Sequence, residues 1–109
     1  GNGTSGAAGT GATGVAAASL TGDVLKFDIT AAVLADGVYT YVASNAADAQ
    51  TFLQNLGADA TAAKDNAFGA ALDSSTGKLY IDIDSNGTVD SVIALSGVTT
   101  ITAAAFVLA

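Results

Sequence analysis

One segment of nine residues carries the side chains best suited to chemistry. Oxygen-bearing side chains stand at its first, third, fifth and ninth positions, a glycine stands at its sixth, and the backbone carbonyl of its seventh residue can add a further oxygen. Calcium binds about six to eight oxygen ligands in a flexible arrangement, and a glycine lets the chain bend sharply around the ion. The sequence therefore predicts a calcium site whose ligands are Asp82, Asp84, Asn86, Thr88 and Asp90.

A plain β-hairpin is the competing interpretation of the same segment. A full EF-hand loop closes with a bidentate glutamate at its twelfth position, and here that position is Ile93, so the loop alone supplies an incomplete shell. The flanking residues alternate as strands do, and Asn86-Gly87 is a strong signal for a two-residue turn. In this interpretation Ile81 and Ile83 face the core, and the aspartates form a solvated face.

The amino-acid composition argues against catalysis. The chain contains no His, Cys, Glu or Arg, so the usual general bases, thiol nucleophiles and oxyanion-binding cations are missing. A hydrolase with paired aspartates stays formally open, because Asp82 and Asp84 project to the same side of a strand. A solvated strand face explains that pair more simply. We therefore expect that this chain is not an enzyme.

The charge balance limits the partners that the chain can bind. Ten aspartates face three lysines, which gives a net charge of −7 at pH 7. Nucleic-acid binding needs a surface rich in Lys and Arg, and anionic membranes also attract basic segments, so we expect neither partner. No apolar run is long enough to cross a bilayer, so we expect no membrane insertion. An acidic surface instead favours divalent cations or simple solubility.

Hydrophobic periodicity predicts a mainly β domain, antiparallel and sandwich-like, with one or two short helices. Patterns that favour strands occur at residues 25–29, 38–44, 68–72, 78–84, 89–95 and 98–101. The spacing of apolar residues predicts a helix over Ala46 to Leu56. Asn45 is suited to cap its start, and Asp48 favours the positive end of the helix dipole. Gly57 is suited to end it.

The composition divides the chain into two parts. Residues 1–22 are rich in Gly, Ala and Thr and carry no charge, which is typical of a flexible linker. An N-terminal strand donated to another subunit is the alternative interpretation. Residues 23–109 are predicted to form the β-rich domain, which ends in an uncharged, apolar tail that contains Phe106. The length suits a single domain with a modest core.

Residues 76–90 have the pattern of a strand, an Asp-rich turn and a second strand. Residues 92–108 form an apolar final segment, and residues 22–28 have the pattern that is typical of the start of a strand. In these three segments the chain resembles the C-terminal region of bacterial proteins exported by type I secretion, among them calcium-binding repeat proteins, S-layer-like proteins and adhesins. The resemblance implies export through an uncleaved C-terminal signal, and hence a secreted, extracellular or cell-surface protein in a calcium-rich setting. Such proteins usually carry an Asp before the final Phe, where this chain has Ala105.

Three functions are compatible with these patterns. The first is a structural subunit of a bacterial surface layer or filament, a homo-oligomer or polymer that assembles by strand and edge contacts under the control of calcium. The second is a non-catalytic C-terminal cap and secretion module of a larger secreted enzyme or adhesin. The third, ranked last, is a calcium-dependent carbohydrate-binding module, for which only Tyr39, Tyr41 and Tyr80 offer a stacking platform. Solvent exposure of Tyr39 and Tyr41 would favour the third function.

Overall fold

A computed structural model of the chain describes residues 12–13, 25–27, 36–59, 61, 64, 67–95 and 97–108. Its helix is α1 (Ala46–Ala58), and a 3-10 turn occupies Ala103–Ala105. Its strands are β1 (Ala12–Thr13), β2 (Leu25–Phe27), β3 (Val38–Ala43), β4 (Phe68–Asp73), β5 (Lys78–Asp82), β6 (Ser91–Ala94) and β7 (Phe106–Leu108). Strands outweigh helix, so the prediction of a mainly β fold with a short helix is confirmed.

The main sheet has five strands in the order β1-β6-β5-β4-β3, and β2 and β7 form a separate two-stranded sheet. The pairs β4-β5 and β5-β6 are antiparallel, as the sequence predicts. The pairs β3-β4, β1-β6 and β2-β7 are parallel, so the main sheet is mixed rather than antiparallel throughout. The parallel pair β3-β4 follows from the position of α1 between these two strands in the sequence, because parallel neighbours need a long crossover connection of this kind.

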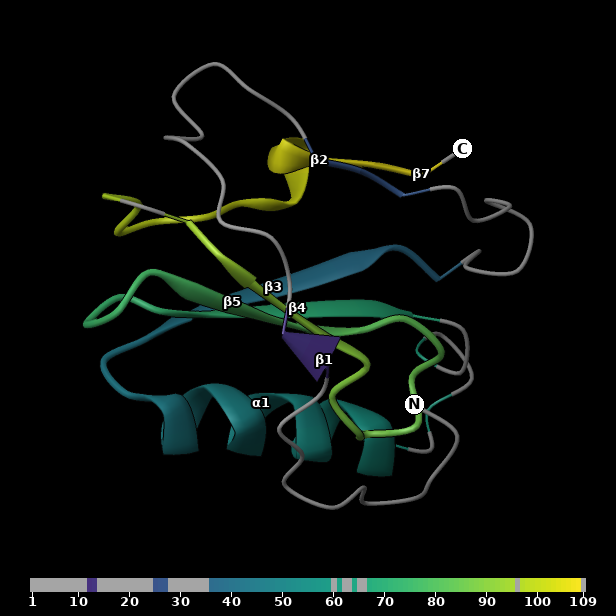
Figure 1. The fold of residues 1–109 in the computed structure, drawn as a ribbon. Coiled ribbons are helices and arrows are strands. Elements are labelled where there is room, and N and C mark those ends of the chain that lie inside the picture. The colour runs from purple at the N-terminus through teal and green to yellow at the C-terminus, as the bar shows by residue number, and fades with distance from the viewer. Residues whose placement is uncertain are drawn as a thin grey trace.

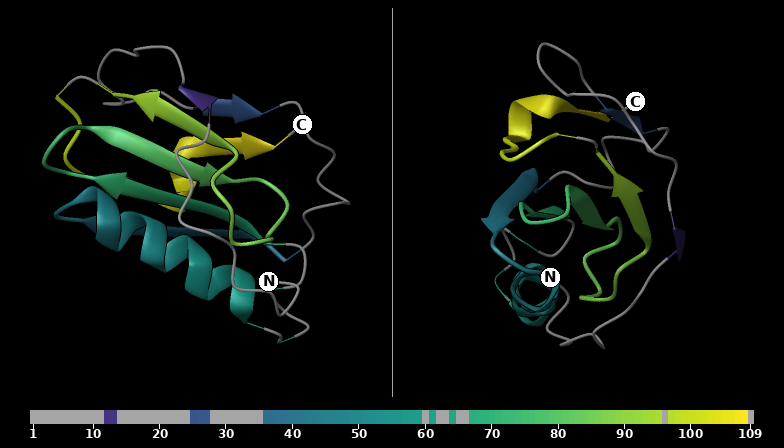
Figure 2. Two further views of the ribbon diagram at one scale, coloured as in Figure 1. Left: turned by 60° about the horizontal axis from the view of Figure 1, so that its bottom comes forward. Right: turned by 60° about the vertical axis from the view of Figure 1, so that its left-hand side comes forward.

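Other elements of the chain cover both faces of the main sheet. In Figure 1, α1 lies below the sheet and the two-stranded sheet lies above it, and the turned views of Figure 2 show the same three layers. Phe68 and Leu72 of β4 pack with Phe106 of β7 in one apolar cluster. Ala71 packs with Leu53 of α1 in the other cluster. Because it is covered from both sides, β4 is buried at every position.

Small residues on the sheet allow α1 to approach it closely. A Cβ atom added to Gly69 of β4 would lie 2.8 Å from a methyl carbon of Leu53 and 2.8 Å from one of Leu56. Leu53 is fully buried and Leu56 is buried as well. Burial of each leucine side chain is worth about 1.5–3 kcal/mol, so the close fit anchors the helix on this face.

The start of α1 matches the prediction, and its end does not. Asn45 caps the helix, since its Oδ1 accepts the N–H of Asp48 at 2.8 Å. The helix then continues through Gly57 to Ala58. The prediction that Gly57 ends the helix is therefore wrong. Gly57 lies buried in the last turn, where the backbone of Gly87 packs against it.

The C-terminal part of the chain also differs from the prediction. No strand forms at residues 98–101 of the described chain, although Val98 and Ile101 are buried in the cluster that contains Phe106. The strand lies further on, at Phe106–Leu108, and pairs with Leu25–Phe27. The apolar tail therefore supplies a strand to its own chain rather than an unpaired edge. Apart from residues 12–13, the N-terminal segment 1–22, predicted to be a linker or a donated strand, lies outside the described residues.

Candidate metal centre

Asp82 ends β5 on the face of the sheet that α1 covers. It stands opposite Gly69 of β4 in the strand register, two residues after Tyr80, which packs in the same cluster as residues of α1. Its side chain is 0% exposed. The hairpin interpretation placed the aspartates of this segment on a solvated face. For Asp82 that prediction is wrong, because the polar face of an alternating strand is itself covered here.

The loop at residues 83–90 folds back onto the end of β5. The N–H of Gly87 donates to Oδ2 of Asp82 at 2.8 Å, which draws the middle of the loop towards the strand. The N–H of Ile83 donates to Oδ2 of Asp90 at 2.7 Å. The N–H of Asp90 donates to the carbonyl of Ile81 at 2.7 Å. Together these bonds close the base of the loop, and they use Asp82 and Asp90, two of the three aspartates that were predicted to be ligands.

The strand register excludes a tight hairpin at Asn86-Gly87. Ile81 pairs with Ser91, so residues 83–90 all belong to the connection between β5 and β6. Oδ1 of Asn86 accepts the N–H of Thr88 at 2.9 Å, which is a local turn closed by a side chain. The prediction of a two-residue hairpin turn is therefore wrong, and the Asp-rich segment forms a wider loop that its own side chains hold in shape.

Two residues bend this loop through the left-handed region of backbone conformation. Gly87 has a φ of 78°, which costs glycine little. Ser85 has a φ of 57° and is the one residue other than glycine with a positive φ in the described part of the chain. Such a conformation costs a serine on the order of 1 kcal/mol. The buried Ser85 hydroxyl donates to the carbonyl of Lys64 at 3.2 Å, and this contact helps to hold the bend.

The loop brings three carboxylates together. Asp82, Asp84 and Asp90 each offer one oxygen, and these oxygens all lie within 4.8 Å of one another. Asp82 is buried, whereas Asp84 is exposed. Neither Lys64 nor Lys78, the lysines whose side chains the structure describes, forms an ion pair with any of the three. Three negative charges at this spacing repel one another unless a cation or a proton neutralises part of the charge.

One oxygen of Asp82 has no partner. Its Oδ1 is buried and accepts no hydrogen bond from any residue that the structure describes. Burial raises the pKa of Asp82 from 3.8 to about 7; the hydrogen bond from Gly87 opposes this rise, and Asp84 and Asp90 add to it. Burial also raises the pKa of Asp90. An unpartnered buried polar group costs about 1–3 kcal/mol, so the ionised form of Asp82 is unfavourable here, and a proton shared with Asp84 or a bound cation relieves the cost.

Asp73 shows how a buried carboxylate is normally satisfied in this chain. It is only 2% exposed, at the end of β4. Its oxygens accept the N–H of Ser75 at 2.9 Å, the hydroxyl of Ser75 at 2.6 Å and the hydroxyl of Thr76 at 2.8 Å. Burial raises its pKa, but these hydrogen bonds outweigh burial, so the pKa is lowered. The missing partner of Asp82 is therefore a property of its site and not of buried aspartates in general.

A hard divalent cation fits the donors at this site. All of the donors are oxygens, and the chain has no Cys or His to hold a softer metal such as zinc. Carboxylates and carbonyls that converge from a flexible loop are typical ligands of calcium. A cation among Asp82, Asp84 and Asp90 would neutralise their repulsion and give Oδ1 of Asp82 a partner. The residues therefore fit a site for an oxygen-ligated divalent cation.

The cluster contains three of the five predicted ligands. The side-chain oxygen of Asn86 accepts the N–H of Thr88, so these two residues shape the loop, and their role as ligands stays a prediction. Sequence reasoning missed two further residues that form the site, Gly57 and Ser85. Gly57 was expected only to end the helix, so its close contact with the loop was not predicted. The sequence gives no signal for Ser85.

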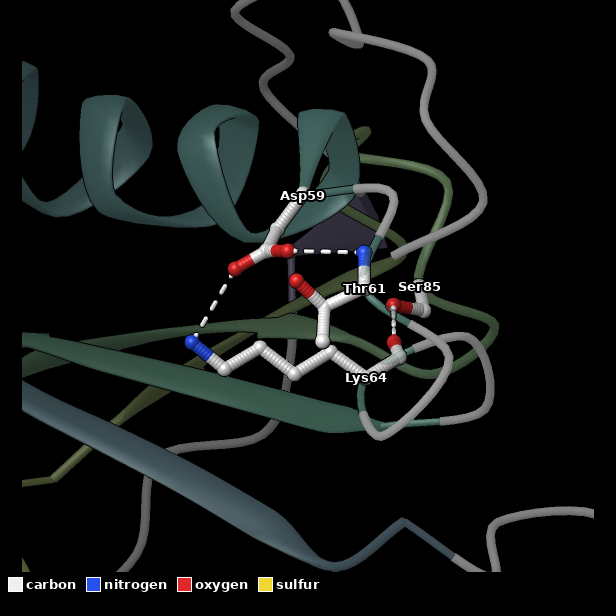
Figure 3. Close-up of polar contacts among 4 residues, drawn as sticks. All are labelled: Asp59, Thr61, Lys64 and Ser85. Atoms are coloured by element: carbon white, nitrogen blue, oxygen red, sulfur yellow. Dashed lines mark hydrogen bonds and ion pairs between the residues drawn. The ribbon is translucent and has the colours of Figure 1, made fainter.

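Ser85 also links the loop to the segment that follows α1 (Figure 3). Its hydroxyl bonds to the carbonyl of Lys64, and the Nζ of Lys64 pairs with Oδ2 of Asp59 at 3.0 Å. Oδ1 of Asp59 accepts the N–H of Thr61 at 2.9 Å. Hydrogen bonds from Thr61 and the charge of Lys64 hold the pKa of Asp59 well below its ordinary value. The position of Lys64 is thus tied to the Asp-rich loop through its main chain.

No protein-family model, curated protein or solved structure matches this chain. Among the described residues, no helix has both the length and the apolar character that crossing a membrane would require.

Proposed function

We propose that the chain is a non-catalytic, calcium-binding structural domain of a bacterial surface layer or filament. The observation that carries the proposal is the buried Asp82 carboxylate, which has one unpartnered oxygen and lies in a cluster with Asp84 and Asp90. Calcium at this cluster supplies the missing partner and removes the charge repulsion. The resemblance to proteins exported by type I secretion adds a secreted or cell-surface location, where calcium is plentiful.

The cluster is placed where a cation stabilises the fold. The loop at residues 83–90 packs by Gly87 against Gly57 in the last turn of α1 and bonds by Ser85 to Lys64. Calcium that neutralises the carboxylates of this loop therefore stabilises the contacts of the loop with α1 and with Lys64. The role is structural, because a cation in this position holds segments of the chain together.

The edge strand β3 supports the assembly part of the proposal. Its sequence, VYTYVA, contains no charged residue and no proline, and Tyr41 and Val42 are 42% and 38% exposed. Within the described part of the chain, β3 pairs with β4 on one side only. Natural proteins usually protect such edges with charges, prolines or bulges. A second copy of the chain would extend the sheet by pairing with this edge.

Calcium binding is tested by isothermal titration and by thermal unfolding at about pH 7.5, with calcium and with excess chelator. A ligand present at about 100 times its Kd stabilises the native state by about 2.7 kcal/mol. We expect Asp82→Asn and Asp84→Asn to abolish or greatly weaken the binding heat. Asp48→Asn is the matched control, since it removes one exposed aspartate outside the cluster and should leave binding unchanged. Equal calcium responses in all three variants would overturn the metal centre.

Assembly is tested by light scattering and negative-stain microscopy under the same two conditions. We expect fibres or sheets in calcium, and we expect Val42→Lys to suppress them by placing a charge on the edge strand. Thr99→Lys is the matched control, because it adds the same charge at an exposed position outside the strands. If the Val42→Lys protein assembles as well as the Thr99→Lys control, assembly through the edge of β3 is contradicted.

The alternative is a non-catalytic cap and secretion module of a larger secreted protein. The observation that favours it is the pairing of Phe106–Leu108 with Leu25–Phe27, which ties the apolar tail into the domain. A monomer that binds calcium but forms no assembly in either condition would support the cap and exclude the filament.

A further inference from the structure

Two adjoining hollows lie on the surface between α1 and β3. The larger has a volume of about 300 Å³ and is lined by Tyr41, Asp48, Thr51, Phe52 and Asn55. The smaller has a volume of about 200 Å³, and it shares Phe52 and Asn55 with the first. We refer to the two hollows together as the aromatic groove. They lie on the sheet edge and helix surface and include none of the clustered aspartates.

Aromatic rings form the base of the groove. Tyr41 stacks on Phe52 with a distance of 5.2 Å between ring centres and an angle of 16° between ring planes. Tyr39 lines the smaller hollow, and the Nζ of Lys64 lies 5.3 Å from the centre of its ring. Tyr41 is 42% exposed, whereas Tyr80 is 7% exposed and so takes no part in a surface platform. The aromatic surface of the groove therefore consists of two tyrosines and a phenylalanine, each with one ring face already covered, since Tyr41 and Phe52 stack on each other and Lys64 lies over Tyr39.

Polar groups surround these rings. Asn55 lines both hollows and is exposed, and its amide offers one acceptor and two donors. Asp59 and Lys64, which pair with each other, lie at one end of the groove, and Asp48 lies at the other. Donors and acceptors thus stand side by side with aromatic faces, which is the combination that small-molecule sites use to orient a ligand.

We propose that the aromatic groove is a binding site for a neutral carbohydrate. Sugar rings present apolar C–H faces that pack on aromatic side chains, and their hydroxyls need both donors and acceptors at the rim. The charges at the groove are two carboxylates and one ammonium group, so the net local charge is unfavourable for phosphates and other anions. None of the clustered aspartates lines this site, so sugar binding and calcium binding are tested independently, although Tyr41 also lies on the β3 edge proposed for assembly.

The site is tested by saturation-transfer NMR and by chemical-shift mapping of the full chain. The probes are glucose, galactose, mannose and N-acetylglucosamine and their β-linked disaccharides, each at concentrations up to about ten times a Kd of about 1 mM. We expect at least one probe to shift the amide signals of Tyr39, Tyr41, Phe52 and Asn55. Parallel titrations in calcium and in chelator separate a failure of this site from a failure of the metal centre.

Three substitutions make the test specific. Asn55→Ala removes the shared amide at an exposed helix position, where alanine favours the helix, and we expect at least tenfold weaker binding from a folded protein. Tyr41→Ala should weaken binding comparably, whereas Tyr41→Phe should retain most of it because the ring is kept. Thr100→Ala, at an exposed position outside the groove, is the control. Absence of any shift with all probes, or binding that Asn55→Ala and Tyr41→Ala leave unchanged, would overturn the proposal.

Discussion

Gly57 and Gly87 are in backbone contact, although they lie in a helix and in a loop that are distant in the sequence. A Cβ atom added to Gly57 would collide with the backbone nitrogen and Cα of Gly87. This contact fixes the distance between α1 and the loop that carries Asp84 and Asp90. A side chain at position 57 would therefore displace this loop and change the positions of its carboxylates.

The substitution Gly57→Ala tests this coupling. In an isolated helix the alanine would add about 1 kcal/mol of stability. Here we expect the opposite, a loss of stability together with at least a tenfold weaker affinity for calcium, because Gly87 must move. Asn55→Ala, at an exposed position of the same helix, should leave the calcium affinity unchanged and raise the stability slightly, because alanine favours the helix. The check is denaturant unfolding and calorimetric titration of both variants; a stabilised Gly57→Ala protein with unchanged affinity would contradict the coupling.

The stability of the calcium-free protein should fall as the pH rises from about 4 to about 7. The pKa of Asp82 is raised from 3.8 to about 7 by folding, so over this range the unfolded chain ionises while the folded chain stays protonated. For Asp82 alone the loss of stability amounts to about 4 kcal/mol and is complete above pH 7, and the raised pKa of Asp90 acts in the same direction. Asp59 and Asp73, whose pKa values are lowered, act below about pH 4 and leave this window unaffected.

Denaturant unfolding in chelator, repeated from about pH 4 to about pH 7, measures this dependence of the unfolding free energy on pH. In calcium the dependence should be weaker, because the ion binds the ionised carboxylates. A calcium-free protein that becomes more stable between about pH 4 and pH 7 would show that Asp82 has a partner in solution.

Asp82→Asn should separate stability from binding. At about pH 8 without calcium we expect the variant to be more stable than the parent chain, because an amide carries no charge to desolvate and can donate where the carboxylate cannot. In saturating calcium the order should reverse, since the variant gains nothing from the ion. The measurement is the melting temperature in the two conditions, and Asp48→Asn is the charge-matched control for the shift that calcium causes. Loss of stability in both conditions would indicate a purely structural aspartate.

Asp73→Ala should behave in the opposite way. Asp73 accepts hydrogen bonds from the exposed residues Ser75 and Thr76, so its removal takes away three bonds to a carboxylate that hold the turn after β4. We expect a loss of about 1–3 kcal/mol in unfolding free energy and an unchanged response to calcium. Chelator and calcium titrations of the variant check both parts. A reduced calcium response would show that the two buried aspartates are coupled.

Much of the site could be predicted from spacing, but its burial could not. The alternation of Asp82 and Asp84 with Ile81 and Ile83 shows which residues share a strand face. It does not show that α1 covers the polar face, because α1 returns to the sheet from a separate part of the chain. That cover turns Asp82 from a solvated residue into a buried one with an unpartnered oxygen.

The fold could be predicted in type but not in pairing. Asn45 and the apolar spacing after it were enough to place the helix, since capping is local chemistry. The parallel pairing of β3 with β4 depends on where α1 packs, which no local pattern encodes. The loop at residues 83–90 was read as a tight turn because Asn86-Gly87 favours one. The bonds of Asp82 and Asp90 to the loop backbone outweigh that preference.

The pairing of β2 with β7 has a consequence for how the molecule folds. It joins Leu25–Phe27 to Phe106–Leu108, and β1 with β6 likewise joins distant parts of the chain. Closing such long loops is slow and entropically costly, whereas β3, α1, β4 and β5 follow one another and can form early. The outer two-stranded layer is therefore the last part of the protein to form and the first to open. Its amides should exchange with solvent long before those of β4.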